Sequence, residues 1–136
     1  MSNKLNNSEK RAKALLLTNF INLNQLSVIF KNEELQNQFD NIYEIISNTP
    51  KVYEQEEIES DKKKFYIHYF NPNSDFYISE KDFENEQLQA YGFACLNGDK
   101  QNAEFGYISI NEIIKLGFEI DLHFQPCLQS TILEKF

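Results

Sequence analysis

Residues 103–126, Ala-Glu-Phe-Gly-Tyr-Ile-Ser-Ile-Asn-Glu-Ile-Ile-Lys-Leu-Gly-Phe-Glu-Ile-Asp-Leu-His-Phe-Gln-Pro, contain the pattern that decides the fold class. Ser109 and Glu112 have the spacing of a capping box, in which side chains satisfy free backbone N–H groups at the start of a helix. Gly117 stands where a left-handed C-terminal cap belongs, because glycine adopts a positive φ without steric penalty. The sequence therefore predicts a short helix between a strand at 104–108 and another strand after the glycine.

Residues 118–125 continue this unit with apolar side chains at every second position. The period of two predicts a half-buried strand, whose polar face would carry Glu119, Asp121 and His123. Two carboxylates and an imidazole could hold a metal ion or act as an acid and base, with His68 joining if it lies on a neighbouring strand. Residues two apart in a strand are about 6.6 Å from one another, so a shared ion would need a bend or outside ligands. A solvated strand face explains the same alternation without any chemistry.

Helices are predicted before this unit, and further strands lead into it. Residues 1–7 are polar and are expected to be frayed. Ser8 can cap a helix that begins at Glu9, and a second short helix or a continuation follows it. Asn32 can cap a helix that ends near Asn48. Aromatic and apolar runs, separated by turn residues, predict strands at 65–70, from 76, at 88–96 with a possible bulge at Gly92, and at 104–108.

These elements predict an α+β domain, with N-terminal helices packed on an antiparallel sheet of four or five strands and one short helix before the last strand. A chain of 136 residues is most simply a single domain. We divide it into a helical elaboration at 1–49, a sheet-rich core at 50–128 and a C-terminal tail at 129–136. The charged stretch 54–64 is expected to be an exposed linker without a role in folding.

Several short motifs occur in an order that resembles a known bacterial family. They are Pro50-Lys51-Val52-Tyr53, Tyr69-Phe70-Asn71-Pro72, Phe76-Tyr77-Ile78-Ser79-Glu80, Tyr91-Gly92, Glu104-Phe105-Gly106-Tyr107-Ile108-Ser109 with Glu112-Ile113, and Glu119-Ile120-Asp121-Leu122-His123-Phe124-Gln125-Pro126. Over about residues 50–128 the chain looks like the domain of unknown function 2958 family, small proteins that are common on conjugative plasmids and other mobile elements.

The resemblance implies a fold and a mobile-element setting, and it transfers no catalytic residue. Two features depart from the family. Tryptophans usually stand at the position of Phe76, and the family's N-terminal part is shorter. Residues 1–47 therefore look like an elaboration peculiar to this protein.

The formal charge of -8 lies in the later part of the chain. Up to Thr49 five basic residues balance five acidic ones, so the stretch from Pro50 onward carries the whole excess. Nucleic-acid binding needs clustered lysine and arginine to neutralise phosphates, whereas Lys62-Lys63-Lys64 stands beside five acids within residues 54–61. We therefore expect no direct nucleic-acid ligand, and instead a protein partner with a basic surface.

Acidic residues recur at every second position from Glu80 to Glu86. If this segment is extended, its four carboxylates form a row of roughly 20 Å that a basic partner could bind. An edge strand or a loop kept soluble by charge explains the same pattern. Exposed tyrosines would anchor such a contact, as aromatic hot spots do in interfaces. The predicted partner-binding residues are Glu54, Glu56, Glu57, Glu59, Glu80, Asp82, Glu84, Glu86, Tyr77, Tyr91 and Tyr107.

Nucleophilic catalysis has little support in the sequence. Cys95 stands in an apolar strand and Cys127 follows a proline, and neither has the spacing of a zinc site or a disulfide framework. Both are expected to be reduced thiols in a cytoplasm. No serine carries a nucleophile-elbow motif and no glycine-rich phosphate loop is present. We expect no cofactor and no membrane span.

The leading hypothesis is a non-catalytic, acidic interaction protein of a phage or plasmid. It would dock on the positive nucleic-acid-binding surface of a host nuclease, as an anti-restriction or anti-CRISPR inhibitor. A first alternative is a small metal-dependent enzyme or nucleic-acid-processing accessory that uses Glu119, Asp121, His123 and perhaps His68. A second alternative is a plasmid-maintenance protein that self-associates through its N-terminal helices.

Overall fold

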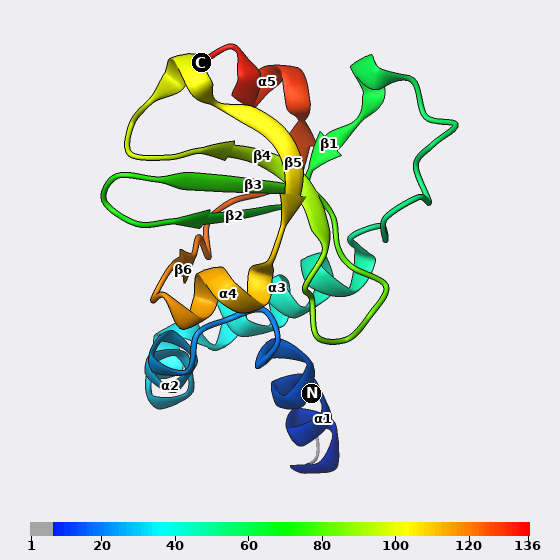
Figure 1. Cartoon of the computed structure of the whole chain (residues 1–136). Coiled ribbons are helices and arrows are strands. Elements are labelled where there is room, and N and C mark those ends of the chain that lie inside the picture. The colour runs from blue at the N-terminus through cyan, green and yellow to red at the C-terminus, as the bar shows by residue number, and fades with distance from the viewer. Residues whose placement is uncertain (1–6) are drawn as a thin grey trace.

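The computed structural model describes residues 7–136 and has an α+β architecture (Figure 1). The segment predicted to be frayed, 1–7, lies outside the described residues except for Asn7, where the first helix begins. The α-helices are α1 (Asn7–Leu17), α2 (Leu23–Lys31), α3 (Gln36–Asn48), α4 (Ile110–Lys115) and α5 (Gln129–Leu133). Three short 3-10 helices are η1 (Glu33–Leu35), η2 (Ser60–Lys62) and η3 (Lys100–Asn102).

Five strands form the main antiparallel sheet, in the order β5-β4-β3-β2-β6. The four strands β2 to β5 follow one another as a meander, and the chain then crosses through α4 to place β6 on the opposite edge, beside β2. A separate two-stranded sheet joins β1 to β7. The strands are β1 (Lys64–Phe65), β2 (Ile67–Phe70), β3 (Asp75–Glu80), β4 (Ala90–Cys95), β5 (Glu104–Ile108), β6 (Glu119–Ile120) and β7 (Cys127–Leu128).

The predicted strand, helix and glycine cap around α4 are confirmed. The Ser109 hydroxyl oxygen accepts the backbone N–H of Glu112 at 3.1 Å, which satisfies one of the free donors at the helix start. Gly117 has a φ of 92°, the left-handed value that a glycine C-cap adopts. Local capping chemistry therefore fixes both ends of this short helix.

The strand predicted over 118–125 is wrong beyond Ile120. The Asp121 carboxylate accepts the backbone N–H of His123 at 2.9 Å, and the N–H of Phe124 bonds the Asp121 carbonyl oxygen at 3.3 Å. These bonds close a turn, because an aspartate side chain offers the backbone an alternative to a strand ladder. The chain re-enters a sheet only at β7, a pairing that the sequence pattern did not indicate.

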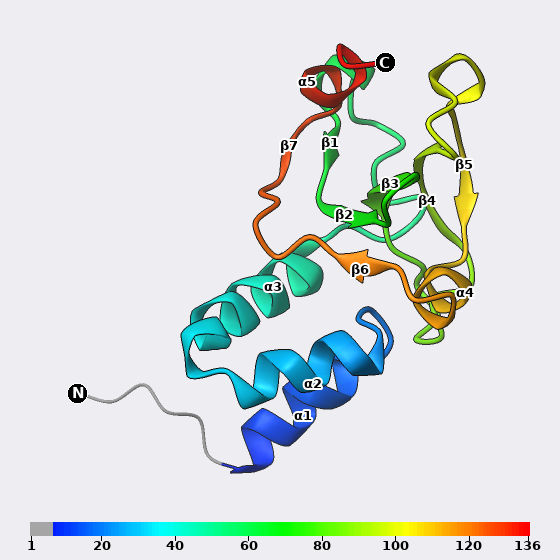
Figure 2. The same ribbon diagram turned by 90° about the vertical axis from the view of Figure 1, so that its left-hand side faces the viewer.

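The N-terminal helices are not a clear layer over the sheet, contrary to the prediction. In Figure 2, α1, α2 and α3 gather on the side of the sheet where β6 and α4 lie. Their buried residues, such as Leu17 and Ile42, share one apolar cluster with Tyr69 and Ile78 of the strands. A smaller cluster on the other face of the sheet joins β1, β3 and β4 to α5. No helix in the described range 7–136 is long and apolar enough to cross a membrane.

Candidate binding surface

The acidic row predicted over residues 80–86 is not extended. Strand β3 ends at Glu80, and the carboxylate of Asp82 then accepts two backbone N–H groups, from Glu84 at 3.0 Å and from Gln89 at 2.8 Å. The loop closes around the Asp82 side chain, which is therefore buried. It therefore shapes the loop and offers no surface to a partner, whereas Glu84 and Glu86 remain exposed.

The acidic stretch after Pro50 lies against this same end of β3. The Val52 N–H donates to the Lys81 carbonyl oxygen at 2.9 Å, and the Lys81 N–H donates to the Pro50 carbonyl oxygen at 2.8 Å. The buried amide of Gln55 donates to the Ser79 carbonyl oxygen at 3.3 Å. The expectation of a linker without a role in folding is therefore wrong. These bonds hold Glu54, Glu56, Glu57 and Glu59, all exposed, on the turns that follow.

Two of the three predicted tyrosines meet on one face of the sheet. The register pairs Tyr91 with Tyr107 and also with Glu80, so the three side chains share a face. The Tyr91 and Tyr107 rings are 5.6 Å apart between centroids and nearly perpendicular. Tyr107 is 59% exposed. The third predicted anchor, Tyr77, is buried and stacks on His68, so it cannot face a partner.

Tyr53 joins the half-buried Tyr91 and the exposed Tyr107 in one tyrosine group, and the prediction of partner-binding residues missed it. Its hydroxyl lies 3.3 Å from the hydroxyl of Tyr107. This hydrogen bond raises the pKa of Tyr107 above its ordinary value, because it favours the protonated phenol. Tyr53 is 61% exposed and has a φ of 75°. A left-handed tyrosine carries no sequence signal of its own, so the contact with β5 becomes visible only in three dimensions.

These residues form what we call the acidic-aromatic surface. Its centre is Tyr53, Tyr91 and Tyr107 beside Glu80, and two acidic loops flank it. Figure 1 shows both loops, residues 51–63 and 81–89, on the side of the molecule next to β5. Its flanking carboxylates are Glu54, Glu56, Glu57, Glu59, Glu84 and Glu86. The arrangement suits binding, because tyrosines supply contact area and the surrounding carboxylates select a cationic partner.

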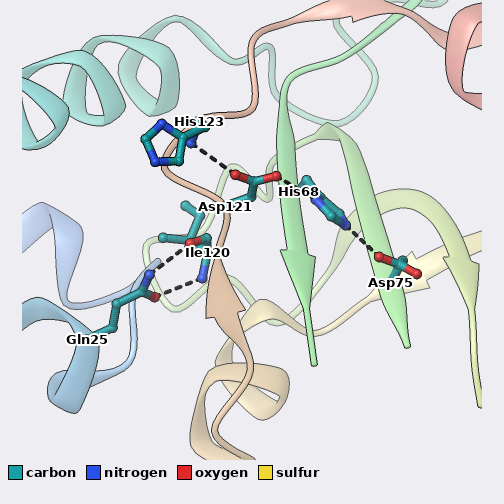
Figure 3. A network of polar contacts seen from close by, with 6 residues as sticks. All are labelled: Gln25, His68, Asp75, Ile120, Asp121 and His123. Carbon is teal, nitrogen blue, oxygen red and sulfur yellow. Dashed lines mark hydrogen bonds and ion pairs between the residues drawn. The ribbon is translucent and has the colours of Figure 1, made fainter. Parts of the chain in front are cut away.

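A second polar network lies on the same face, farther toward β6 (Figure 3). The Nε2 atom of His68 is 2.7 Å from a carboxylate oxygen of Asp75, and Nδ1 is 3.1 Å from one of Asp121. The ring stacks on Tyr77, with centroids 4.4 Å apart and planes 7° from parallel. Burial, and then the carboxylates of Asp75 and Asp121, raise the pKa of Tyr77 to about 12, so its phenol stays neutral.

The geometry of His68 suits a structural clamp better than catalysis. Each ring nitrogen lies within hydrogen-bonding distance of a carboxylate oxygen, one from β3 and one from the turn after β6. Both nitrogens are therefore engaged by side chains of the protein itself. The clamp joins β2 to the start of β3 and to the turn after β6.

The acid and imidazole group predicted on the last strand is not assembled. His68 and Asp121 do meet, but Glu119 is exposed at the edge strand β6. His123 points its ring away from His68 in Figure 3, over a hollow that Asn37 and Asn41 of α3 also line. Across residues 7–136 no group of three or more histidine, cysteine, aspartate or glutamate side chains could hold a metal ion.

The two cysteines are free thiols in surroundings that disfavour the thiolate. Cys95 is buried in β4, and Cys127 is partly buried in β7. Burial raises the pKa of both thiols, and the carboxylate of Asp75 adds to the effect at Cys95. A protonated thiol is a weak nucleophile, so neither residue has the environment of an activated cysteine.

No protein-family model matches the chain, and no match was found among the curated proteins or the solved structures. The resemblance to the domain of unknown function 2958 family therefore stays a prediction from its motifs.

Proposed function

We propose that this protein is a non-catalytic interaction module that binds a basic protein through its acidic-aromatic surface. The single observation behind the proposal is the meeting of two acidic loops around Tyr53, Tyr91 and Tyr107. Exposed tyrosines ringed by charge are typical of binding hot spots. The chain's charge of -8 favours a cationic partner and speeds its encounter.

The partner class that fits best is a protein whose own ligand is a nucleic acid. Such a protein presents a channel of lysine and arginine, and an acidic protein that docks there excludes the nucleic acid. A restriction enzyme or a CRISPR effector nuclease of the host has this chemistry. We therefore propose an anti-defence inhibitor of a phage or plasmid, in keeping with the mobile-element setting that the motif resemblance implies.

The test is inhibition of DNA cleavage by a panel of purified restriction endonucleases and CRISPR effector nucleases. We expect inhibition of at least one of them, weaker at higher salt, because surface charge attraction is screened. The combined change Glu54→Gln, Glu56→Gln and Glu57→Gln should weaken inhibition about tenfold or more, since charged rims steer association.

The matched control removes the same charge elsewhere, by Glu33→Gln, Glu34→Gln and Glu44→Gln on η1 and α3. It should leave inhibition within about twofold of the unchanged protein, because those residues lie outside the acidic-aromatic surface. An equal loss of inhibition in both triple variants would show that only the net charge matters, and it would contradict the assigned surface. Capture of phage or plasmid structural proteins alone, without any inhibited nuclease, would contradict the partner class.

A second candidate function is self-association through the N-terminal helices. Large apolar side chains are exposed on α1 and α2, namely Leu15, Leu23, Val28 and Phe30. If two copies pair through this region, Val28→Lys should convert a dimer to a monomer in light scattering, because it buries a charge in the interface. Leu96→Lys is the control, because Leu96 lies outside α1 and α2. The two side chains are similarly exposed, at 50% for Leu96 and 57% for Val28. A monomer before any substitution excludes this function.

A further inference from the structure

The rest of the protein covers one edge of the main sheet, at β6, and leaves the other edge, at β5, uncovered. At the β6 edge, the Gln25 side chain of α2 imitates a neighbouring strand. Its amide N–H donates to the Ile120 carbonyl oxygen at 2.8 Å, and its oxygen accepts the Ile120 N–H at 2.8 Å (Figure 3). Asn22 adds a third bond, to the Phe118 carbonyl oxygen at 2.8 Å. The β6 edge is therefore closed, as unpaired strand edges usually are.

The β5 edge has no such cover. Within the described range, residues 104–108 make their backbone hydrogen bonds in the ladder with β4, and their outward N–H and C=O groups have no partner in the protein. Figure 2 shows β5 at the margin of the sheet with no element beyond it. Glu104, Phe105 and Tyr107 are exposed along the strand. Gly106, at its centre, has no atom within 4 Å of the position a Cβ would take.

We propose that the β5 edge receives an extended, lysine- or arginine-rich segment of the partner as an added strand. This inference rests on the proposed function and specifies how the partner binds. Backbone pairing supplies affinity in such complexes, and side chains on alternate sides supply selectivity. Here the added strand would lie beside Phe105 and Tyr107 on one face and Glu104 on the other.

Charge decides between a basic segment and a second copy of this chain. Glu80 lies two strands in from this edge, on the face of Tyr107, and Glu104 and Glu112 line a hollow of about 290 Å³ on the opposite face. Two copies that paired through β5 would bring these carboxylates toward those of the neighbour, and each chain carries a charge of -8. Like charges across an interface disfavour association, whereas a cationic strand is attracted.

The test uses two synthetic peptides of the same charge, each eight residues long with alternating lysine and valine. One has an unmodified backbone, and the other is N-methylated at its four central residues, which removes the donors on both strand edges. We expect the unmodified peptide to bind at least about tenfold more tightly, since pairing needs those donors. We also expect it to slow hydrogen exchange at outward amides within 104–108.

Two variants at one position provide the control. Gly106→Lys places a cation on the edge, as natural proteins do to block strand addition, and should abolish the preference for the unmodified peptide. Gly106→Ala adds a side chain in the same open space without a charge, and this variant should keep the preference for the unmodified peptide. Equal binding of both peptides, or unchanged exchange at 104–108, overturns strand addition while leaving nuclease inhibition untouched. A dimer that Gly106→Lys dissociates would assign the edge to a second copy and overturn the basic segment. Inhibition that fails altogether overturns the proposed function as well.

Discussion

Gly92→Ala is expected to destabilise the protein by more than about 3 kcal/mol, or to prevent folding, because a side chain at this position has no space. A Cβ on Gly92 would lie 1.9 Å from the carbonyl oxygen of Tyr77 and 2.9 Å from its carbonyl carbon. Both atoms belong to the backbone of β3, so no rotamer change relieves the clash. Relief requires β3 and β4 to separate, in the middle of the sheet.

The control is Gly106→Ala, at the residue that faces Gly92 across the β4 and β5 ladder. No atom lies within 4 Å of its Cβ position, so the change should alter stability by less than about 1 kcal/mol. Urea unfolding of both variants, followed by circular dichroism, measures the difference. A Gly92→Ala protein that unfolds at the same urea concentration as the Gly106→Ala protein would show that the strands do not approach so closely.

Gly92 also illustrates what a sequence pattern can and cannot locate. A glycine inside a strand is typical of either a bulge or a close backbone approach, and the sequence indicated a possible bulge at Gly92. The register shift lies instead in β3, between Ile78 and Glu80, and Gly92 is the residue that accommodates the neighbouring strand. The pattern indicated an irregularity in this part of the sheet, but the strand that contains it depends on long-range pairing.

Elements whose ends are marked by capping or turn residues were predicted well. The α4 unit, the end of α3 at Asn48 and the strand 104–108 all follow from caps, apolar spacing and turn residues. The strand β7 was not predicted, β1 and β2 were predicted as one strand at 65–70, and β6 is only two residues of the strand predicted at 118–125. Two-residue strands depend on their partners rather than on their own sequence. The turn at Asp121 overrode an alternating pattern that is otherwise typical of a strand.

The candidate site was predicted only in part. The acidic composition and the pair Tyr91 and Tyr107 were identified from the sequence, because charge and aromatic content are visible there. Asp82 and Tyr77 were assigned to the surface, yet the first satisfies backbone donors of its loop and the second packs in the core. The contribution of Tyr53 depends on hydrogen bonds between Lys81 and residues around Val52, which no periodicity reveals.

His68→Leu should destabilise the protein by about 2 to 3 kcal/mol, because it leaves two carboxylates that face the same site without a donor between them. Leucine keeps much of the buried volume, so the loss of stability reflects the missing hydrogen bonds rather than a new cavity. The Asp75 and Asp121 side chains are 36% and 29% exposed, and partial solvation keeps the penalty below that of a fully buried charge. Urea unfolding measures it.

The double variant His68→Leu with Asp121→Asn separates a clamp from an acid and base pair. The asparagine side chain can still accept the His123 N–H through its amide oxygen, and the substitution removes one of the two facing charges. We therefore expect the double variant to be more stable than His68→Leu by about 1 kcal/mol, although Asp121→Asn alone should weaken the protein. If His68→Leu leaves the unfolding midpoint unchanged, the three side chains do not hold β2, β3 and the turn after β6 together. The network would then be free for a chemical role, and the assignment of His68 as a structural clamp would fail.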